Sequence, residues 1–358
     1  MGKYPRVVAD MPKLTENAGT VVQWCQQAGV SVTFVGKCIA EEPKVLSQVL
    51  AMQIHSVGDS RLENLSGLNT ELPKMLLRIG MPDTAEEIVA IADISLQSEI
   101  KTIQALNQAA GKLGVVHKVI LMIDLGDLRE GIMFTDSEKI LATAQTILSA
   151  ENLELYGVGT NLTCYGSIVP DETNLGNLCS IADMIRDRFQ VELPVISGGN
   201  SSSLNLLQKG TMPGKINHLR IGEAILLGTD TSTGKKFPQL HDDAFLLEAE
   251  LIEVQEKPSF PIGERSVDAF GKEREYIDHG QMRRGILAVG RQDVPPEELI
   301  PVEEEITVMG GSSDHLIVDL GTYPAEVGDV LQFKLTYGAL LAAYTSKYVG
   351  KCLKEEQE

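Results

Sequence analysis

The chain has 358 residues and a formal net charge of −19 at pH 7, from 31 lysines and arginines and 50 aspartates and glutamates. Hydrophobic residues make up 43% of it, enough for a sizeable core, and the length favours two domains over one. An acidic surface repels nucleic acid and anionic membranes, so we expect neither as a main partner.

Nothing in the sequence predicts a membrane-spanning or secreted protein. No apolar run approaches the ~20 residues that a membrane helix needs, and the opening stretch MGKYPRVVAD has no signal-peptide core. The five cysteines have no paired spacing, and no pair of histidines or cysteines suggests a metal site. We therefore expect a cytoplasmic protein with reduced thiols and no metal ion.

From residue 1 to about residue 230, short apolar runs alternate with longer amphipathic stretches. The apolar runs are typical of buried strands and cover residues 6–10, 31–37, 54–59, 74–80, 92–96, 118–126, 155–162, 193–199 and 218–222. The stretches at 15–29, 137–150 and 174–189 are typical of helices. Roughly eight strand–helix units predict a closed (β/α)8 TIM-like barrel in an α/β protein, in preference to an open sheet.

The pattern changes after residue 240, where strands predominate and helices are few. Strand-like runs cover residues 244–257, 284–290, 305–311, 315–321 and 329–341. The segment 228–243, rich in Gly, Thr and Asp, marks the join. We therefore predict a (β/α)8 barrel over residues 1–235 and a β-rich domain over residues 236–358, and leave open whether the N-terminal strand joins the second domain.

Barrel active sites gather where the strands end, so residues at those ends are the candidates. One of them is Lys37, which directly follows a buried strand and Gly36. A lysine there either extends to solvent or pairs with a carboxylate, or it forms a Schiff base with an aldehyde cofactor such as pyridoxal phosphate. Nearby arginines favour the last role, because they disfavour the charged ammonium.

Two loops of small residues follow the last two predicted strands. SGGNSSSL (197–204) offers backbone N–H groups and hydroxyls, and RIGEAILLG (220–228) has Gly222 directly after a strand. Barrels commonly bind phosphate at such loops, although a serine-rich turn before a helix has the same composition. Together with Lys37, the loops indicate a site for pyridoxal phosphate.

These stretches resemble the alanine racemase family, pyridoxal-phosphate enzymes with a barrel and a C-terminal β domain. The resemblance covers nearly the whole chain and is greatest to the ornithine racemase-like branch. It is carried by VGKCIA, VGDSRLENL, KMLLRI, ADISLQSE, DLGDLREG, GVGTNLTCYG, LPVISGGNSSS, LRIGEAILLG, EKPSFPIGE, SSDHLIVD and YGALL. It implies an amino-acid racemase that forms a homodimer with shared active sites.

The resemblance also assigns roles residue by residue. Lys37 falls on the lysine that binds the cofactor and acts as one of two bases, and Arg129 falls near the phenolic oxygen and the substrate. Arg220 falls on the arginine that faces the pyridine nitrogen, although alone it would suit a salt bridge at the barrel mouth. A permanent cation there disfavours ring protonation, which favours racemisation over transamination. The expected cofactor contacts are Lys37, Arg129, Asn161, Asn200, Ser201, Arg220, Gly222 and Glu223.

The sequence departs from the family at the second base. The Gly-Tyr-x-Asp segment of alanine racemases is here GRQD, with Arg291 in place of the tyrosine. The loop GGSSDHL (310–316) aligns with a loop that approaches the substrate from the partner chain. It offers Asp314 and His315 as candidate catalytic residues and Ser313 as a candidate substrate contact. His315 is equally compatible with an ordinary strand histidine.

The expected substrate is a basic amino acid, ornithine first and lysine next. Its side-chain ammonium needs a nearby carboxylate, since a buried unpaired cation is costly. Asp127, Glu41 and Glu223 are the spare carboxylates near the mouth. Asp127 is the first choice, with an internal salt bridge to Arg129 as its alternative role. Two other functions stay open: a basic amino-acid decarboxylase of the same fold, and a non-catalytic pyridoxal-phosphate-binding protein.

Overall fold

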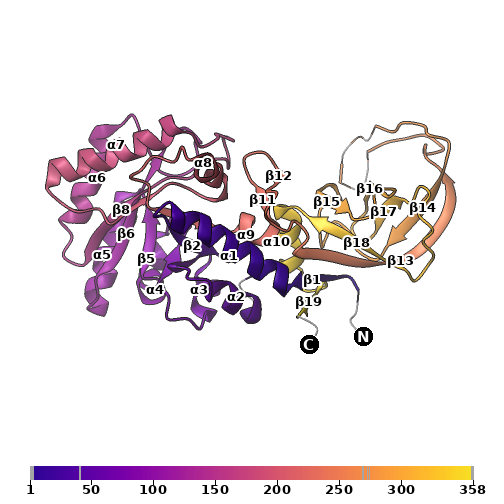
Figure 1. The fold of residues 1–358 in the computed structure, drawn as a ribbon, viewed down its shortest axis with the longest axis horizontal. Helices are drawn as coiled ribbons and strands as arrows, with labels where there is room; N and C mark the ends of the chain where they lie inside the picture. Colours follow the sequence, from indigo (N-terminus) through magenta and orange to yellow (C-terminus); the bar gives the residue numbers. More distant parts are fainter. Residues whose placement is uncertain (1–3, 40–41, 268–269, 272, 274, 356–358) are drawn as a thin grey trace. The chain divides into compact units, whose positions relative to one another are not determined.

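The computed structural model describes residues 4–39, 42–267, 270–271, 273 and 275–355. The chain divides into two compact units (Figure 1). One unit consists of Leu14–His241, and the other combines Met1–Lys13 with Asp242–Glu358. The N-terminal strand therefore belongs to the same unit as the C-terminal third of the chain.

Eight parallel strands close into a barrel in the unit Leu14–His241. Their order is β5-β4-β3-β2-β10-β9-β8-β6, and β6 also pairs with β5, which closes the ring. The strands are β2 (Ser31–Val35), β3 (Ser56–Asp59), β4 (Lys74–Leu76), β5 (Ile94–Gln97), β6 (His117–Asp124), β8 (Leu153–Gly159), β9 (Val195–Ser197) and β10 (His218–Ile221). The predicted barrel is confirmed.

Helices alternate with these strands and surround the barrel. Figure 1 shows α5, α6 and α7 along the outside of the strands. Asp136 and Asp171 begin α6 and α7 by accepting the N–H groups of Lys139 and Asn174. The helices are α1 (Met11–Gln27), α2 (Pro43–Leu50), α3 (Leu62–Gly67), α4 (Ala85–Ile91), α5 (Ile100–Leu113), α6 (Ser137–Leu148), α7 (Glu172–Phe189), α8 (Leu204–Lys209) and α9 (Glu223–Leu227). Shorter elements are η1 (Pro82–Thr84), η2 (Ser201–Ser203), β7 (Ile132–Met133), β11 (Thr229–Asp230) and β12 (Lys235–Lys236).

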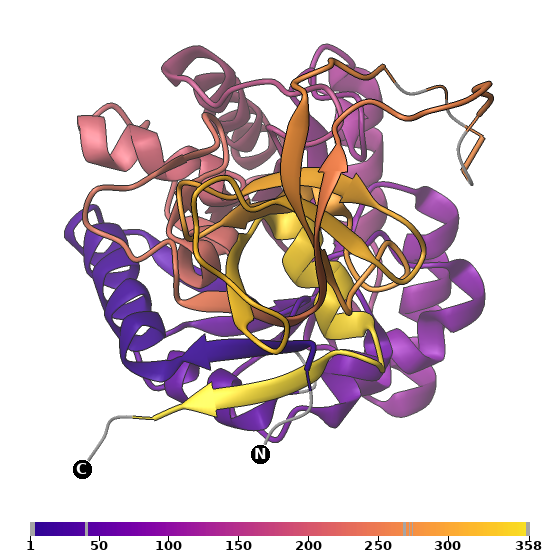
Figure 2. The same cartoon turned by 90° about the vertical axis from the view of Figure 1, so that its right-hand side faces the viewer.

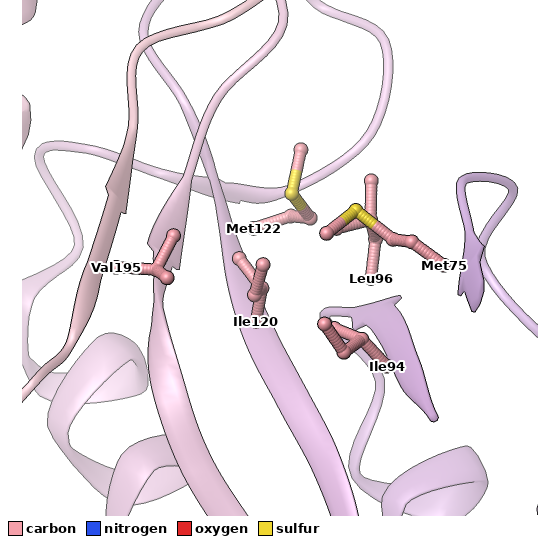
Figure 3. Close-up of a cluster of buried hydrophobic side chains, with 6 residues drawn as sticks. All are labelled: Met75, Ile94, Leu96, Ile120, Met122 and Val195. Carbon is pink, nitrogen blue, oxygen red and sulfur yellow. The ribbon is translucent and has the colours of Figure 1, made fainter. Parts of the chain in front are cut away.

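The barrel interior is apolar on one side and polar on the other. The apolar side is a cluster from β4, β5, β6 and β9, each member at most 7% exposed (Figure 3): Met75, Ile94, Leu96, Ile120, Met122 and Val195. Ser197 lies two residues after Val195 on β9 and so faces the same interior. It meets the polar side chains of His218 on β10, Thr33 on β2 and Ser56 on β3, all nearly fully buried.

The other unit is built on an eight-stranded sheet that is mostly antiparallel. Its strands are β1 (Arg6–Asp10), β13 (Phe245–Pro258), β14 (Gln281–Leu287), β15 (Leu299–Pro301), β16 (Thr307–Gly311), β17 (Leu316–Asp319), β18 (Val330–Leu335) and β19 (Gly350–Lys354), with η3 (Pro296–Glu298) between β14 and β15. The β-rich C-terminal domain is thereby confirmed. Among the described residues of both units, we find no helix that is long and apolar enough to cross a membrane.

Two expectations about single segments were wrong. The run at 6–10 predicts a barrel strand, but β1 pairs antiparallel with β13 and parallel with β19, as Figure 2 shows for β1 and β19. The run at 329–341 predicts one strand, but β18 ends at Leu335. Thr336 then accepts the N–H of Ala339 and begins helix α10 (Tyr337–Thr345), whose Ala and Leu residues favour a helix.

Candidate active site

Lys37 lies in the turn that follows β2. The N–H of Gly36 donates to Gly58 O on β3 (3.0 Å), and the N–H of Ile39 donates to Gly36 O (2.8 Å), so the turn is tied to the neighbouring strand. The Lys37 side chain is half-buried, and its amine has no hydrogen-bond or ion-pair partner in the part of the chain that the structure describes. Burial raises the pKa of Asp59 at the end of β3, and the positive charge of Lys37 is among the interactions that oppose this rise.

Arg220 is buried on β10, the strand next to β2. It is 3% exposed, and its backbone partner on β2 is Thr33. Its guanidinium donates to Ser197 Oγ, to Thr160 O (2.6 Å) and to Asn161 Oδ1 (2.7 Å). Burial lowers the pKa of Arg220 to about 10. The group is therefore still a cation at neutral pH.

Glu130 connects the second predicted arginine, Arg129, to Arg220. Its carboxylate accepts hydrogen bonds from Arg129 and from Asn161 Nδ2, while Asn161 Oδ1 accepts from Arg220. Arg129 also donates to Cys164 Sγ (3.1 Å). The sequence analysis predicted both arginines and Asn161 but did not include Glu130. Its place directly after Arg129, beyond a strand end, is the signal that could have identified it.

Asp127 has a structural role in this geometry. It is 1% exposed, and its carboxylate accepts the N–H groups of Cys164 (3.3 Å), Tyr165 (2.9 Å) and Ile168 (3.1 Å). Arg129, its alternative partner, binds Glu130 instead. The carboxylate is therefore committed to the loop 163–168, and we revise its predicted contact with a substrate ammonium. Glu41, another spare carboxylate, lies outside the described residues.

The first predicted phosphate loop follows β9 and is held by its own side chains. Asn200 Oδ1 accepts the N–H of Ser202 (2.9 Å), and Asn200 Nδ2 donates to Leu162 O (2.9 Å). Ser201 is 3% exposed, and its Oγ accepts the N–H of Ala224 (3.2 Å) in helix α9. This bond brings the loop after β9 against the loop after β10.

The second predicted phosphate loop contains Gly222 and Glu223. A Cβ at position 222 would lie 2.7 Å from Val35 O, so glycine is needed for the start of α9 to approach β2 this closely. Burial raises the pKa of Glu223, although hydrogen bonds from Thr229 (3.2 Å) and Thr231 oppose the rise. Glycine at this position therefore has a packing reason as well as a predicted phosphate contact.

Ser313, Asp314 and His315 lie in the other unit, between β16 and β17. His315 Nδ1 and Asp314 Oδ1 are 2.9 Å apart, and both side chains are largely exposed. Hydrogen bonds from Ser312 and then His315 lower the pKa of Asp314, which is therefore ionised at neutral pH. Arg291, at the position of the family tyrosine, pairs with Glu297 (2.9 Å). Across the described residues, no group of acidic, histidine or cysteine side chains could hold a metal ion.

Comparison with known proteins gives a consistent result. A family model described as "Alanine racemase, N-terminal domain" matches residues 9–230. The chain is 43% identical to an ornithine racemase of Acetoanaerobium sticklandii over 351 residues, which is 97% of this chain and 99% of the relative. It is 36% identical to a lysine racemase of Thermotoga maritima over 352 residues, 97% and 98% of the two chains. A solved structure of alanine racemase from Streptomyces coelicolor A3(2) has the same fold, with a TM-score of 0.75, 18% identity and 98% coverage of each chain.

Proposed function

Because the chain belongs to the alanine racemase family, we propose that it is a pyridoxal-phosphate-dependent racemase of basic amino acids, ornithine first and lysine next. The two relatives named for ornithine and lysine support this substrate class, since each is similar over nearly its full length. One structural observation carries the proposal. The half-buried Lys37 amine, without a partner among the described residues, follows β2, and the buried Arg220 cation lies on the adjacent strand β10.

The residues at this end of the barrel fit the cofactor. Lys37 has a free amine for the aldehyde carbon, and the Thr160 hydroxyl, buried beside Arg220, also has no partner among the described residues. We assign the phosphate to Asn200, Ser201 and Gly222, the ring nitrogen to Arg220 and the phenolic oxygen to Arg129, with Asn161 and Glu223 completing the site. When bound, pyridoxal phosphate withdraws electrons from the substrate Cα–H bond and so acidifies its proton.

The protein then has to move a proton at Cα. Lys37 Nζ is proposed as the base on one face of the substrate. Asp314 and His315 of the partner chain in a homodimer are proposed for the other face, with Ser313 as a substrate contact. Since His315 Nδ1 bonds to Asp314, His315 Nε2 is the atom available for proton exchange.

Two other functions predict different products. A decarboxylase of this fold would place a glutamate at the ring nitrogen, where this chain has Arg220, and a non-catalytic cofactor carrier would resemble the barrel alone. A basic amino-acid racemase is the function that agrees with both features.

The test is a racemisation screen with added pyridoxal phosphate. L-ornithine, L-lysine, L-arginine and L-alanine are incubated with the protein, and both chirality and CO₂ release are measured. We expect D-ornithine to form fastest, and the Lys37→Ala variant to be inactive. Release of CO₂ would indicate the decarboxylase, and absence of turnover with every amino acid would leave only cofactor binding.

The shared site of the proposed homodimer has its own test. A Lys37→Ala variant and an Asp314→Ala/His315→Ala variant should each be inactive, because each lacks one base. Mixed under conditions of subunit exchange, they should recover part of the activity. A fully active monomer, or no recovery after exchange, would contradict the shared site. The free cysteines of the chain support a cytoplasmic location.

A further inference from the structure

A continuous chain of hydrogen bonds crosses the polar side of the barrel interior below Arg220. From the guanidinium it passes to Ser197 Oγ, then to His218 Nδ1 (2.8 Å). It continues from His218 Nε2 to Thr33 Oγ1 (2.7 Å) and from there to Ser56 Oγ (2.5 Å). Every member is at most 3% exposed, and the members come from the four strands β9, β10, β2 and β3.

The direction of this chain follows from its first donor. A guanidinium only donates, so Ser197 Oγ accepts from Arg220 and gives its own proton to His218 Nδ1. The imidazole is then neutral, with its proton on Nε2, and donates to Thr33, which donates onward to Ser56. The opposite tautomer would leave the Ser197 hydroxyl proton without an acceptor among the described residues, a costly state for a buried group.

The surroundings of His218 also keep the ring neutral. Burial lowers its pKa to about 3, and the positive charges of Arg220 and His55 lower it further. The two ring nitrogens meet only hydroxyls, from Ser197 on β9 and Thr33 on β2. No carboxylate contacts the ring to favour the imidazolium. An uncharged ring can therefore support Arg220 without adding a second cation beside it.

We propose that His218 is a positioning residue for Arg220: through Ser197 it fixes the plane of the guanidinium against Thr160 and Asn161. This inference rests on the proposed function, in which Arg220 faces the ring nitrogen of the cofactor. Barrel interiors are dominated by bulky branched residues, as on the apolar side of this one. A buried polar network is stabilising only when every member is satisfied, and this network is satisfied in the single direction that Arg220 imposes.

The chain offers a matched control for His218. His117 is also buried, at 2% exposed, and burial lowers its pKa to about 4. It bonds to Ser95 Oγ (2.8 Å) and has no printed link to Arg220 among the described residues. His117→Leu and His218→Leu therefore remove comparable buried imidazoles, but only the second breaks the chain to Arg220. Thr33→Val removes the acceptor of Nε2 at constant shape, and Thr33→Ser keeps it.

The first experiment needs no cofactor. Nitrogen-15 NMR of histidine-labelled protein, with His218 assigned from the His218→Leu spectrum, reports the tautomer directly. We expect His218 to be neutral and protonated on Nε2 from pH 6 to 8 ( places a free histidine near pKa 6.5, about the middle of this range). Thr33→Val should shift its Nε2 resonance, and Thr33→Ser should restore it. A ring protonated on Nδ1, or one that becomes charged in this range, would overturn the proposal.

The second experiment uses protein reconstituted with pyridoxal phosphate. His218→Leu should shift the visible absorption band of the cofactor and lower kcat for ornithine on the order of tenfold, with a much smaller change in KM. Thr33→Val should act in the same direction and Thr33→Ser should recover, while His117→Leu should lower only the thermal stability. Equal changes of band and kcat in the two histidine variants would refute a positioning role. If wild type binds cofactor but does not racemise, the proposed function fails, whereas the tautomer and the absorption band still decide the role of His218.

Discussion

Replacing Arg220 with lysine would keep the positive charge but remove the planar fork of donors. The guanidinium reaches three acceptors that lie around it: Ser197 Oγ, Thr160 O and Asn161 Oδ1. A single ammonium at the end of a flexible stem cannot reach all three, because its donors diverge from one atom. At least one buried acceptor is then left unpaired in Arg220→Lys.

The size of the effect follows from that loss. A buried polar group without its partner costs about 1–3 kcal/mol, and a domain of this size loses about 2–4 °C in Tm per kcal/mol. We therefore expect Arg220→Lys to unfold roughly 2–12 °C below wild type. The racemisation rate should also fall, since burial lowers the pKa of a lysine and so weakens the cation at this position.

The assay is thermal unfolding of the cofactor-free protein, with Arg129→Lys as the control. The Arg129 side chain is 40% exposed and pairs with Glu130, so its replacement leaves the remaining partners in contact with water. An exposed ion pair contributes at most about 1 kcal/mol, and the Tm of this control should change little. Equal Tm values for Arg220→Lys and wild type would refute the argument that the guanidinium fork is what holds this site together.

The remaining predictions concern single groups. Borohydride treatment of the cofactor-loaded protein should attach the cofactor covalently at Lys37, and peptide mapping that finds it elsewhere, or a Lys37→Ala protein that still incorporates it, would contradict the assignment. Asp127→Asn should lower kcat/KM for ornithine and alanine by the same factor, because the carboxylate holds a loop; a selective loss with ornithine would restore its direct contact with substrate. His117 and His218 have folded-state pKa values of about 4 and about 3 against 6.5 when free, so the unfolded chain binds more protons below pH 6.5. The free energy of unfolding should therefore fall by about 1.4 kcal/mol per pH unit for each histidine between pH 6 and 4, measured by urea unfolding, and His117→Leu should flatten this slope. Among the cysteines, exposed Cys164 should react first with maleimide in the native protein, and equal labelling of the buried thiols would show that the barrel opens.

The residues predicted best are those at strand ends. In a parallel barrel every strand carries its last residues to the same edge, so a lysine after one apolar run and an arginine within another can be placed on that edge from their positions alone. Lys37 and Arg220 belong to adjacent strands for this reason. The family resemblance then added the chemistry that position alone does not supply.

Pairing between side chains was predicted less well, because it depends on contacts that are distant in sequence. Asp127 has a carboxylate beside Arg129, and its neighbours in sequence suggest a salt bridge. Its bonds instead go to Cys164, Tyr165 and Ile168, nearly forty residues away. Glu130 binds Asn161, 31 residues along the chain. A strand pattern indicates which face a residue occupies, but not which carboxylate on that face is already committed.

His218 shows how the same limitation can be partly overcome. It stands two residues before Arg220 on β10, so the strand period places both side chains on one face. That face is the barrel interior, where a leucine would suit the apolar cluster on the opposite side. A histidine and an arginine at alternate positions of a buried strand therefore require other polar residues nearby, and Ser197, Thr33 and Ser56 meet that requirement. The polar half of the barrel is explained by Arg220: a cation buried this deeply needs acceptors, and its acceptors need an ordered chain of donors behind them.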